Sequence, residues 1–170
     1  MRLETGPSER HTLSVLVDNE AGILARIAGM FSSRGYNIES LTVDVTEDEA
    51  VSRMTIVTSG SPHVIEQIIS QLDRLVPVHK VTDLTAAGPH IERELALIKV
   101  AGAGEHRIEA MRLADIYRAR VLDATTTSFV FELTGGTRKV NSFIDLLREV
   151  GLVEVARTGV VAMARGKAPA

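Results

Sequence analysis

The chain has 170 residues, of which 45% are hydrophobic and 24% charged, and 19 basic and 22 acidic side chains give a net charge of -3. This balance, with an aromatic content of 4%, disfavours nucleic-acid binding, which needs a basic surface or stacking aromatics. The lack of cysteine excludes disulfides and thiolate metal sites. No apolar run suits a signal peptide or a membrane helix, so we expect a cytoplasmic protein with no membrane association.

The sequence begins with the periodicities of a strand, a helix and a second strand. Residues 12–17 alternate as a half-buried strand, and apolar side chains then recur on one helical face. The members of this helical stripe are Ile23, Leu24, Ile27, Met30 and Phe31. After a turn at Arg34-Gly35, alternation resumes at 41–46 and predicts the second strand.

A third strand, a second helix and a fourth strand follow. The third strand is expected to turn Met54 and Ile56 inward. Ser61 is expected to cap the next helix, with Pro62 at its first helical position. A last strand is expected at 76–84, so the order is βαββαβ.

The second half of the chain repeats this order. Residues 85–91 are small and turn-prone, which predicts a linker between domains at 11–84 and 92–166. Beyond the linker, the patterns predict strands at 95–100, 120–124, 128–133 and 152–156, helices at 105–117 and around 140–147, and a final segment at 159–163. The predicted fold class is α+β, with two tandem ferredoxin-like βαββαβ domains, each a sheet covered by helices on one face.

Patterns for catalysis or metal binding are weak. The histidines are scattered singly, and none has the i, i+4 spacing of a helical metal site. Gly102-Ala103-Gly104 begins like a dinucleotide fingerprint, but Arg107 stands where the third glycine belongs. The acidic run at 47–49 is typical of a solvated hairpin tip. We therefore predict a chain without catalytic residues or a metal site.

The turn at 18–22 carries a binding signal. It leads from a strand directly into a helix, whose first N–H groups, around Ile23 and Leu24, suit a carboxylate. The side-chain oxygen of Asn19 or a carbonyl of the turn suits an ammonium, and Gly22 allows close approach of the backbone. The spacing alone also fits a plain turn in which Asn19 is a turn residue and Gly22 a left-handed kink.

Longer stretches of sequence identify a family. The first half contains the strings DNEAGIL (18–24), RGYNIESL (34–41) and SRMTI (52–56). Together they closely resemble the ACT domain of the small subunit of acetolactate (acetohydroxyacid) synthase. The strings EREL (92–95) and EVARTGVV (154–161) are similar to the C-terminal domain of that family, so the resemblance covers about 12–166.

The resemblance implies a non-catalytic regulatory subunit whose first domain is an ACT domain. In the family, a large catalytic subunit carries thiamine diphosphate, magnesium and FAD and condenses pyruvate with pyruvate or 2-oxobutyrate in branched-chain amino-acid synthesis. The small subunit activates it and confers feedback inhibition by valine, with leucine and isoleucine as alternative effectors. We therefore expect a large-subunit partner and no cofactor in this chain.

The resemblance also implies an effector site between the ACT domains of a homodimer. The family's binding positions map onto Asn19, Ala21, Gly22, Ile23, Leu24, Asn37 and Ile38. The second strand of a βαββαβ sheet is an edge. Pairing two such edges across a two-fold axis would bring Asn37 of one chain near Asn19 and Gly22 of the other.

Two other functions stay open on sequence alone. One is a stand-alone ACT-type amino-acid sensor that acts on another partner. The other is a pair of ferredoxin-like RNA-binding domains, which is disfavoured because Phe129 and Phe131 lack the flanking glycines and basic residue of that motif. We expect both phenylalanines in the core of the second domain, to which the resemblance assigns docking or activation of the large subunit.

Overall fold

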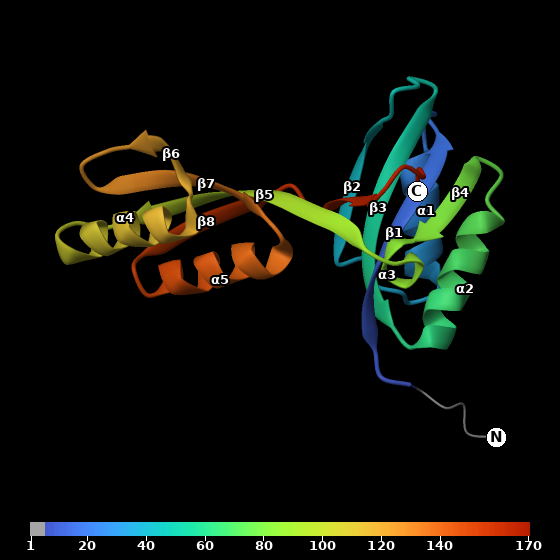
Figure 1. The fold of residues 1–170 in the computed structure, drawn as a ribbon, viewed down its shortest axis with the longest axis horizontal. Coiled ribbons are helices and arrows are strands. Elements are labelled where there is room, and N and C mark those ends of the chain that lie inside the picture. The colour runs from blue at the N-terminus through green and yellow to red at the C-terminus, as the bar shows by residue number, and fades with distance from the viewer. Residues whose placement is uncertain (1–5) are drawn as a thin grey trace. The chain divides into compact units, whose positions relative to one another are not determined.

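A computed structural model describes residues 6–170, which divide into two compact units (Figure 1). Unit 1 consists of the described residues up to Ile91 together with Val160–Ala170. Unit 2 consists of Glu92–Gly159. The chain therefore leaves unit 1 once, builds unit 2, and returns to unit 1 with its last residues.

Unit 1 contains an antiparallel sheet with the strand order β2-β3-β1-β4. Its main elements are β1 (Glu9–Asp18), α1 (Ile23–Ser33), β2 (Ser40–Val45), β3 (Val51–Gly60), α2 (Pro62–Asp73) and β4 (Val78–Asp83). Strand β1 is central because β3 and β4 pair with its two sides, and β2 is an edge of this sheet. This is the predicted ferredoxin-like order.

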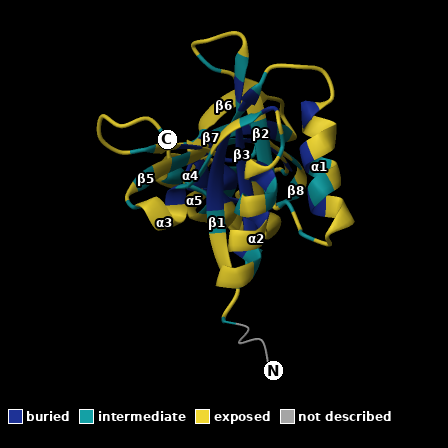
Figure 2. Cartoon of the chain, turned by 90° about the vertical axis from the view of Figure 1, so that its right-hand side faces the viewer, coloured by how far each residue is buried: buried dark blue, intermediate teal, exposed yellow. Residues whose placement is uncertain are grey.

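Helices α1 and α2 cover one face of the first sheet. Alternation along β1 places Leu13, Val15 and Val17 on this face, where they are fully buried. Ile27 of α1 and Ile68 of α2 complete the same apolar cluster. Figure 2 shows the result, with buried inner sides and exposed outer sides on both helices.

The opposite face of this sheet is also covered, which the sequence did not indicate. The short helix α3 (Leu84–Ala87) lies against β1 and against β9 (Val161–Ala164), a strand of the returning chain. Asp83 caps α3 by accepting from the N–H groups of Thr85 and Ala86. The expected linker at 85–91 is therefore partly helical, and its last residues begin strand β5.

Unit 2 repeats the topology, with the strand order β6-β7-β5-β8. Its elements are β5 (His90–Ala101), α4 (Glu105–Tyr117), β6 (Arg120–Ala124), β7 (Ser128–Gly135), α5 (Thr137–Arg148) and β8 (Leu152–Arg157). Phe129 and Phe131 stack with ring centroids 5.3 Å apart inside its core, as expected. Glu94 is buried but accepts a hydrogen bond from Arg157. The α+β fold with two βαββαβ units is thus confirmed.

Three local expectations need correction. The fourth strand begins at Val78, and Val76 is 95% exposed in the preceding turn. Ser61 occupies the cap position of α2, with Pro62 after it, but the serine side chain makes no capping hydrogen bond. The fourth strand also ends one residue early, at Asp83, because Leu84 begins the short helix α3.

Two negative observations apply to residues 6–170. None of their helices is long and apolar enough to cross a membrane. No group of three or more His, Asp or Glu side chains among them is placed to hold a metal ion.

The core assignment predicts unequal losses of stability for two neighbouring leucines of α5. Leu147 is fully buried, whereas Leu146 is 44% exposed. We expect Leu147→Ala to lower the free energy of unfolding by about 2–5 kcal/mol through cavity formation, and Leu146→Ala by less than about 1 kcal/mol. Urea denaturation followed by circular dichroism measures both, and equal losses would contradict the packing described.

Candidate functional site

The turn after β1 is held in place by backbone hydrogen bonds on both sides. The N–H of Asp18 donates to the carbonyl of Pro77 at 2.8 Å, and the N–H of Asn19 donates to the carbonyl of Ala50 at 2.8 Å. Pro77 precedes β4, and Ala50 precedes β3. The central strand is thus tied to both neighbours where it ends, which fixes the start of the turn.

Side chains add two further ties at the same place. The Asn19 amide Nδ2 donates to the carbonyl of Glu49 at 2.9 Å. Because a carbonyl can only accept, this contact assigns the orientation of the Asn19 amide and leaves Oδ1 as its acceptor. His79 Nε2 lies 2.5 Å from Asp18 Oδ1, and both side chains are about half exposed.

The turn ends at Gly22, which begins α1 in the left-handed region with a φ of 87°. Helical bonding starts with the N–H of Arg26, which donates to the carbonyl of Gly22 at 3.0 Å. Glycine offers no side-chain cap, and the first turn of α1 has no acidic residue. The N–H groups at the start of α1, before that of Arg26, are therefore left for an external acceptor, with the positive end of the helix dipole behind them.

The other residues expected in the first turn divide between core and surface. Ile23 is 6% exposed and belongs to the apolar cluster of unit 1, so its contribution to a site would be its backbone N–H. Ala21 and Gly22 are exposed. Leu24 is 42% exposed and is the apolar side chain of this group that remains open for contact.

Asn37 and Ile38 lie before β2, which begins at Ser40. Ile38 packs against the apolar cluster of unit 1, whereas Asn37 is exposed. The carbonyl of Asn37 accepts from the Thr58 hydroxyl at 2.7 Å, so its backbone is held independently of its side chain.

The register of the sheet separates these two groups within one chain. Ser40, at the start of β2, is opposite Val57 of β3, whereas Asp18 is opposite Val51. The interval from Val51 to Val57 corresponds to about 20 Å along a strand at about 3.3 Å per residue. One chain therefore does not bring Asn37 to the Asn19 turn.

Unit 2 has an equivalent turn with different chemistry. The N–H of Ala101 donates to the carbonyl of Gly151 at 2.9 Å, and that of Gly102 to the carbonyl of Thr127 at 2.9 Å, as Asp18 and Asn19 do in unit 1. Here Gly102 replaces the asparagine. Glu105 opens α4 and places a carboxylate in the first turn, where an anionic ligand would have to lie. The turn of unit 1 is thus the better anion site.

Several residues at the turn could not be found from sequence patterns. Glu49, Ala50 and Pro77 contribute main-chain carbonyls, which leave no signature in side-chain chemistry. The polar run at 47–49 is exposed, as expected for a hairpin tip. His79 was one of the scattered histidines, and only the sheet register places it beside Asp18.

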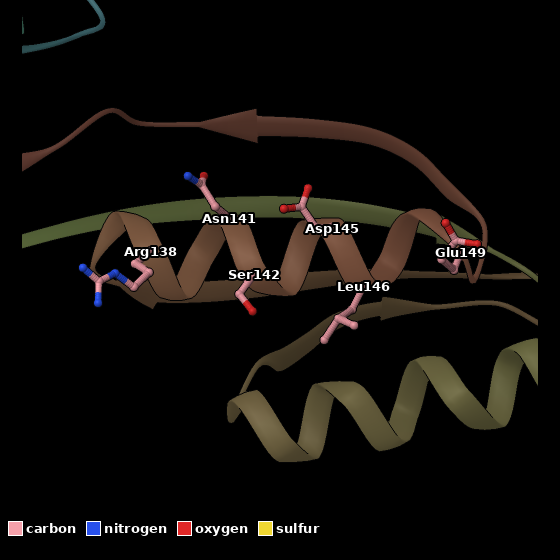
Figure 3. Close-up of a pocket in the computed structure, with 6 residues that line it drawn as sticks. All are labelled: Arg138, Asn141, Ser142, Asp145, Leu146 and Glu149. Carbon is pink, nitrogen blue, oxygen red and sulfur yellow. The ribbon is translucent and has the colours of Figure 1, made fainter. Parts of the chain in front are cut away.

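The surface of unit 2 has an open hollow of about 500 Å³ along α5 (Figure 3). Its lining residues are Arg138, Asn141, Ser142, Asp145, Leu146 and Glu149. Leu146 points toward α4, whereas Asn141 and Asp145 point away from it. Because α5 and the residue that follows it supply the whole lining, the hollow has groups on one side only and is not shaped to enclose a ligand.

Two ion pairs lie along the helices of unit 2. Arg112 donates to both carboxylate oxygens of Glu109, at 2.8 and 2.7 Å, and this hydrogen bonding lowers the pKa of Glu109. Arg148 lies 3.4 Å from Asp145 in the same way. These pairs are exposed, so they add little to stability.

The βαββαβ sandwich of unit 1, with its glycine turn between the central strand and the first helix, defines an ACT domain. A family model described as an AHAS small subunit-like ACT domain matches residues 13–80. A second model, described as the small subunit of acetolactate synthase, matches residues 93–166. The chain belongs to the family of acetolactate synthase small subunits.

Individual relatives agree over nearly the whole length. The "Probable acetolactate synthase small subunit" of Archaeoglobus fulgidus is 51% identical over 92% of this chain and 98% of that protein. The acetolactate synthase isozyme 3 small subunit of Escherichia coli is 47% identical over 92% of this chain and 96% of its own length. The crystal structure of the acetolactate synthase small subunit from Thermotoga maritima has a TM-score of 0.83 and 39% identity, covering 94% of this chain and 99% of that one.

The geometry of α1 predicts stability changes of opposite sign at two glycines. A Cβ would meet nothing within 4 Å at either Gly22 or Gly29, but only Gly22 has a positive φ, of 87°. We expect Gly22→Ala to destabilise unit 1 by about 1 kcal/mol through left-handed backbone strain. Gly29→Ala should stabilise it by about 0.5–1 kcal/mol through helix propensity. Thermal unfolding of both variants tests this, and a stabilising Gly22→Ala would refute the left-handed turn.

Proposed function

We propose that this chain is the regulatory subunit of acetolactate synthase, which binds valine at the Asn19 turn and controls a large catalytic subunit in the cytoplasm. The observation that carries the proposal is the start of α1 at Gly22, where no side chain caps the first N–H groups and no acidic residue occupies the first turn. Thiamine diphosphate, magnesium and FAD are assigned to the large subunit. The role of this chain is activation and feedback inhibition of the first common step of branched-chain amino-acid synthesis.

The chemistry of the turn matches the two charges of an amino acid. The N–H groups of Ile23 and Leu24 suit the carboxylate, since they lie at the positive end of α1. Asn19 Oδ1 suits the ammonium, because Nδ2 of the same amide is occupied by Glu49. Leu24 offers apolar contact to a branched side chain. Leucine and isoleucine fit the same description and are the alternative effectors.

The energetics favour a site shared between two chains. Micromolar affinity requires about 8 kcal/mol, whereas a helix terminus contributes about 1 kcal/mol and burial of an isopropyl group about 2 kcal/mol. Further charge-assisted hydrogen bonds must therefore converge on the ligand. Asn37 is a second mapped asparagine able to donate and accept them, but within one chain it lies at the end of β2 far from the Asn19 turn.

A homodimer through β2 resolves this separation. Strand β2 is an edge, and its residues Val43 and Val45 are 41% and 47% exposed. Antiparallel pairing of two β2 strands would place the start of one β2 at the same end of the joined sheet as the Asn19 turn of the partner. The same pairing would cover this edge and its exposed valines.

Regulation then follows from linkage. Valine controls the large subunit only if it binds one arrangement of the ACT pair more tightly than another. A site assembled from both chains has this property, because its affinity depends on how the two edges meet. Valine then affects the large subunit only as far as that subunit also binds these arrangements with different affinities.

Gly22 and Gly35 provide a matched test of the site. Both have positive φ values, of 87° and 70°, and open space for a side chain, but Gly35 follows the end of α1. Gly22→Asp places a carboxylate among the N–H groups at the start of α1. We expect it to abolish valine binding in calorimetric titration and feedback inhibition in the reconstituted enzyme, with activation retained.

Gly35→Asp should bind valine like the wild-type protein, with lysine as a negative control ligand. If the wild-type protein binds none of valine, leucine and isoleucine, in isolation or with the large subunit, the proposed effector function is wrong. Copurification with a different partner and no effect on the synthase would favour a stand-alone sensor.

Mixing two defective proteins tests whether the site is shared. Gly22→Asp damages the turn, and Asn37→Ala damages the residue before β2. A mixed dimer of the two has one site with both defects and one with neither. We therefore expect valine binding to reappear when the two variants are unfolded together and refolded, although neither binds alone. No recovery in verified mixed dimers would contradict a site built from two chains.

A further inference from the structure

The face of the first sheet opposite α1 and α2 is buried although it is mainly polar. Thr12 and Ser14 of β1 and Thr55 of β3 are at most 3% exposed. In an isolated two-layer sandwich this face would be open to solvent, as antiparallel sheets permit. Its burial therefore requires a cover.

Part of this cover is the returning chain at Val160. Its N–H donates to the Ser40 hydroxyl at 2.8 Å, and its carbonyl accepts from the Thr42 hydroxyl at 2.9 Å. Both hydroxyls belong to β2 and point away from the helices, since Leu41 between them packs against the apolar cluster of unit 1. Figure 1 shows the C-terminal segment, in red, crossing β2 and β3.

Apolar burial accompanies these two hydrogen bonds. Val160 and Ala162 are 2% and 8% exposed, whereas Val161 and Met163 are 54% and 70% exposed. This alternation means that one side of the segment faces unit 1 and the other faces solvent. Farther on, Lys80 Nζ of β4 donates to the carbonyl of Pro169 at 3.3 Å. Residues 160–170 thus contact both edge strands of the sheet.

We propose that Val160–Ala164 is a positioning segment for β2, and thereby for the half of the effector site that Asn37 supplies. The identity of the ligand in this inference rests on the proposed effector function, but the contacts between the segment and β2 do not depend on that function. Val160 is bonded to Ser40 and Thr42, close in sequence to Asn37. Gly159 is the last residue of unit 2, so one peptide bond joins that unit to the residue that holds β2.

Two adjacent valines allow a matched experiment. Val160→Ala removes buried methyl groups, and Val161→Ala removes exposed ones. Hydrogen–deuterium exchange read by mass spectrometry on the peptide containing β2 measures how firmly that strand is held. We expect Val160→Ala to speed this exchange about tenfold, the factor for losing two buried methyl groups, and Val161→Ala to leave it unchanged. The dissociation constant for valine should rise about three- to tenfold for Val160→Ala alone.

A second pair of variants serves if Val160→Ala fails to fold. Ser40→Ala and Thr42→Val each remove one hydroxyl bond to Val160 without opening a large cavity, and Ser33→Ala removes a hydroxyl bond to the Met30 carbonyl as a control. Unchanged β2 exchange, or faster exchange with unchanged valine affinity, would overturn the proposal. If the wild-type protein binds no branched-chain amino acid, the effector function fails, and the exchange result alone decides whether the segment positions β2.

Discussion

Strand β1 is paired on both sides and covered on both faces, and the position of the candidate site follows from that constraint. Where β1 ends, the N–H groups of Asp18 and Asn19 donate to carbonyls that precede β4 and β3. The turn to Gly22 is therefore fixed by the ends of three strands, and α1 starts at a defined place. Donors held in this way lose little freedom when a ligand binds, which is how a small polar site reaches useful affinity.

Unit 2 shows that the constraint alone does not make a site. Its central strand β5 ends with the same pair of backbone hydrogen bonds, made by Ala101 and Gly102, and its helix also follows a glycine with a positive φ. Gly102 lacks the amide of Asn19, and Glu105 supplies a carboxylate within the first turn of α4. The two units thus share a scaffold and differ in what the turn can bind, so function is assigned from the residues of each turn and not from the fold.

The sequence predicted most of the fold because periodicity is a local property. The order of both βαββαβ units, the stripe of α1 and the placement of Phe129 and Phe131 in the core all follow from spacing. The cover on the second face of unit 1 could not be predicted this way. It depends on contacts such as Val160 with Ser40 and Thr42, which join residues far apart in the sequence through main-chain atoms.

The candidate site likewise has features that local sequence predicts and features that depend on contacts between distant residues. Asn19 and Gly22 could be selected from residue type and spacing, since an amide and a left-handed glycine have recognisable roles. The separation of Asn37 from that turn comes only from the register of β2 on β3. Likewise, the partners that orient Asn19 and Asp18 are a carbonyl of Glu49 and the ring of His79, and neither has a sequence pattern.

These features connect the returning chain to the proposed effector site through a single strand. Strand β2 is the edge proposed to meet a second chain, and it is also the strand to which Val160 is bonded. If the affinity for a ligand depends on the position of β2, then ligand binding is coupled to every other contact that fixes this strand. Coupling of this kind is reciprocal. An event that strengthens or weakens the docking of Val160 on β2 changes the affinity for the effector by a certain factor, and effector binding changes the docking equilibrium of the segment by the same factor. Unit 2, which precedes Val160 in the chain, is then able to influence regulation without contributing a residue to the effector site.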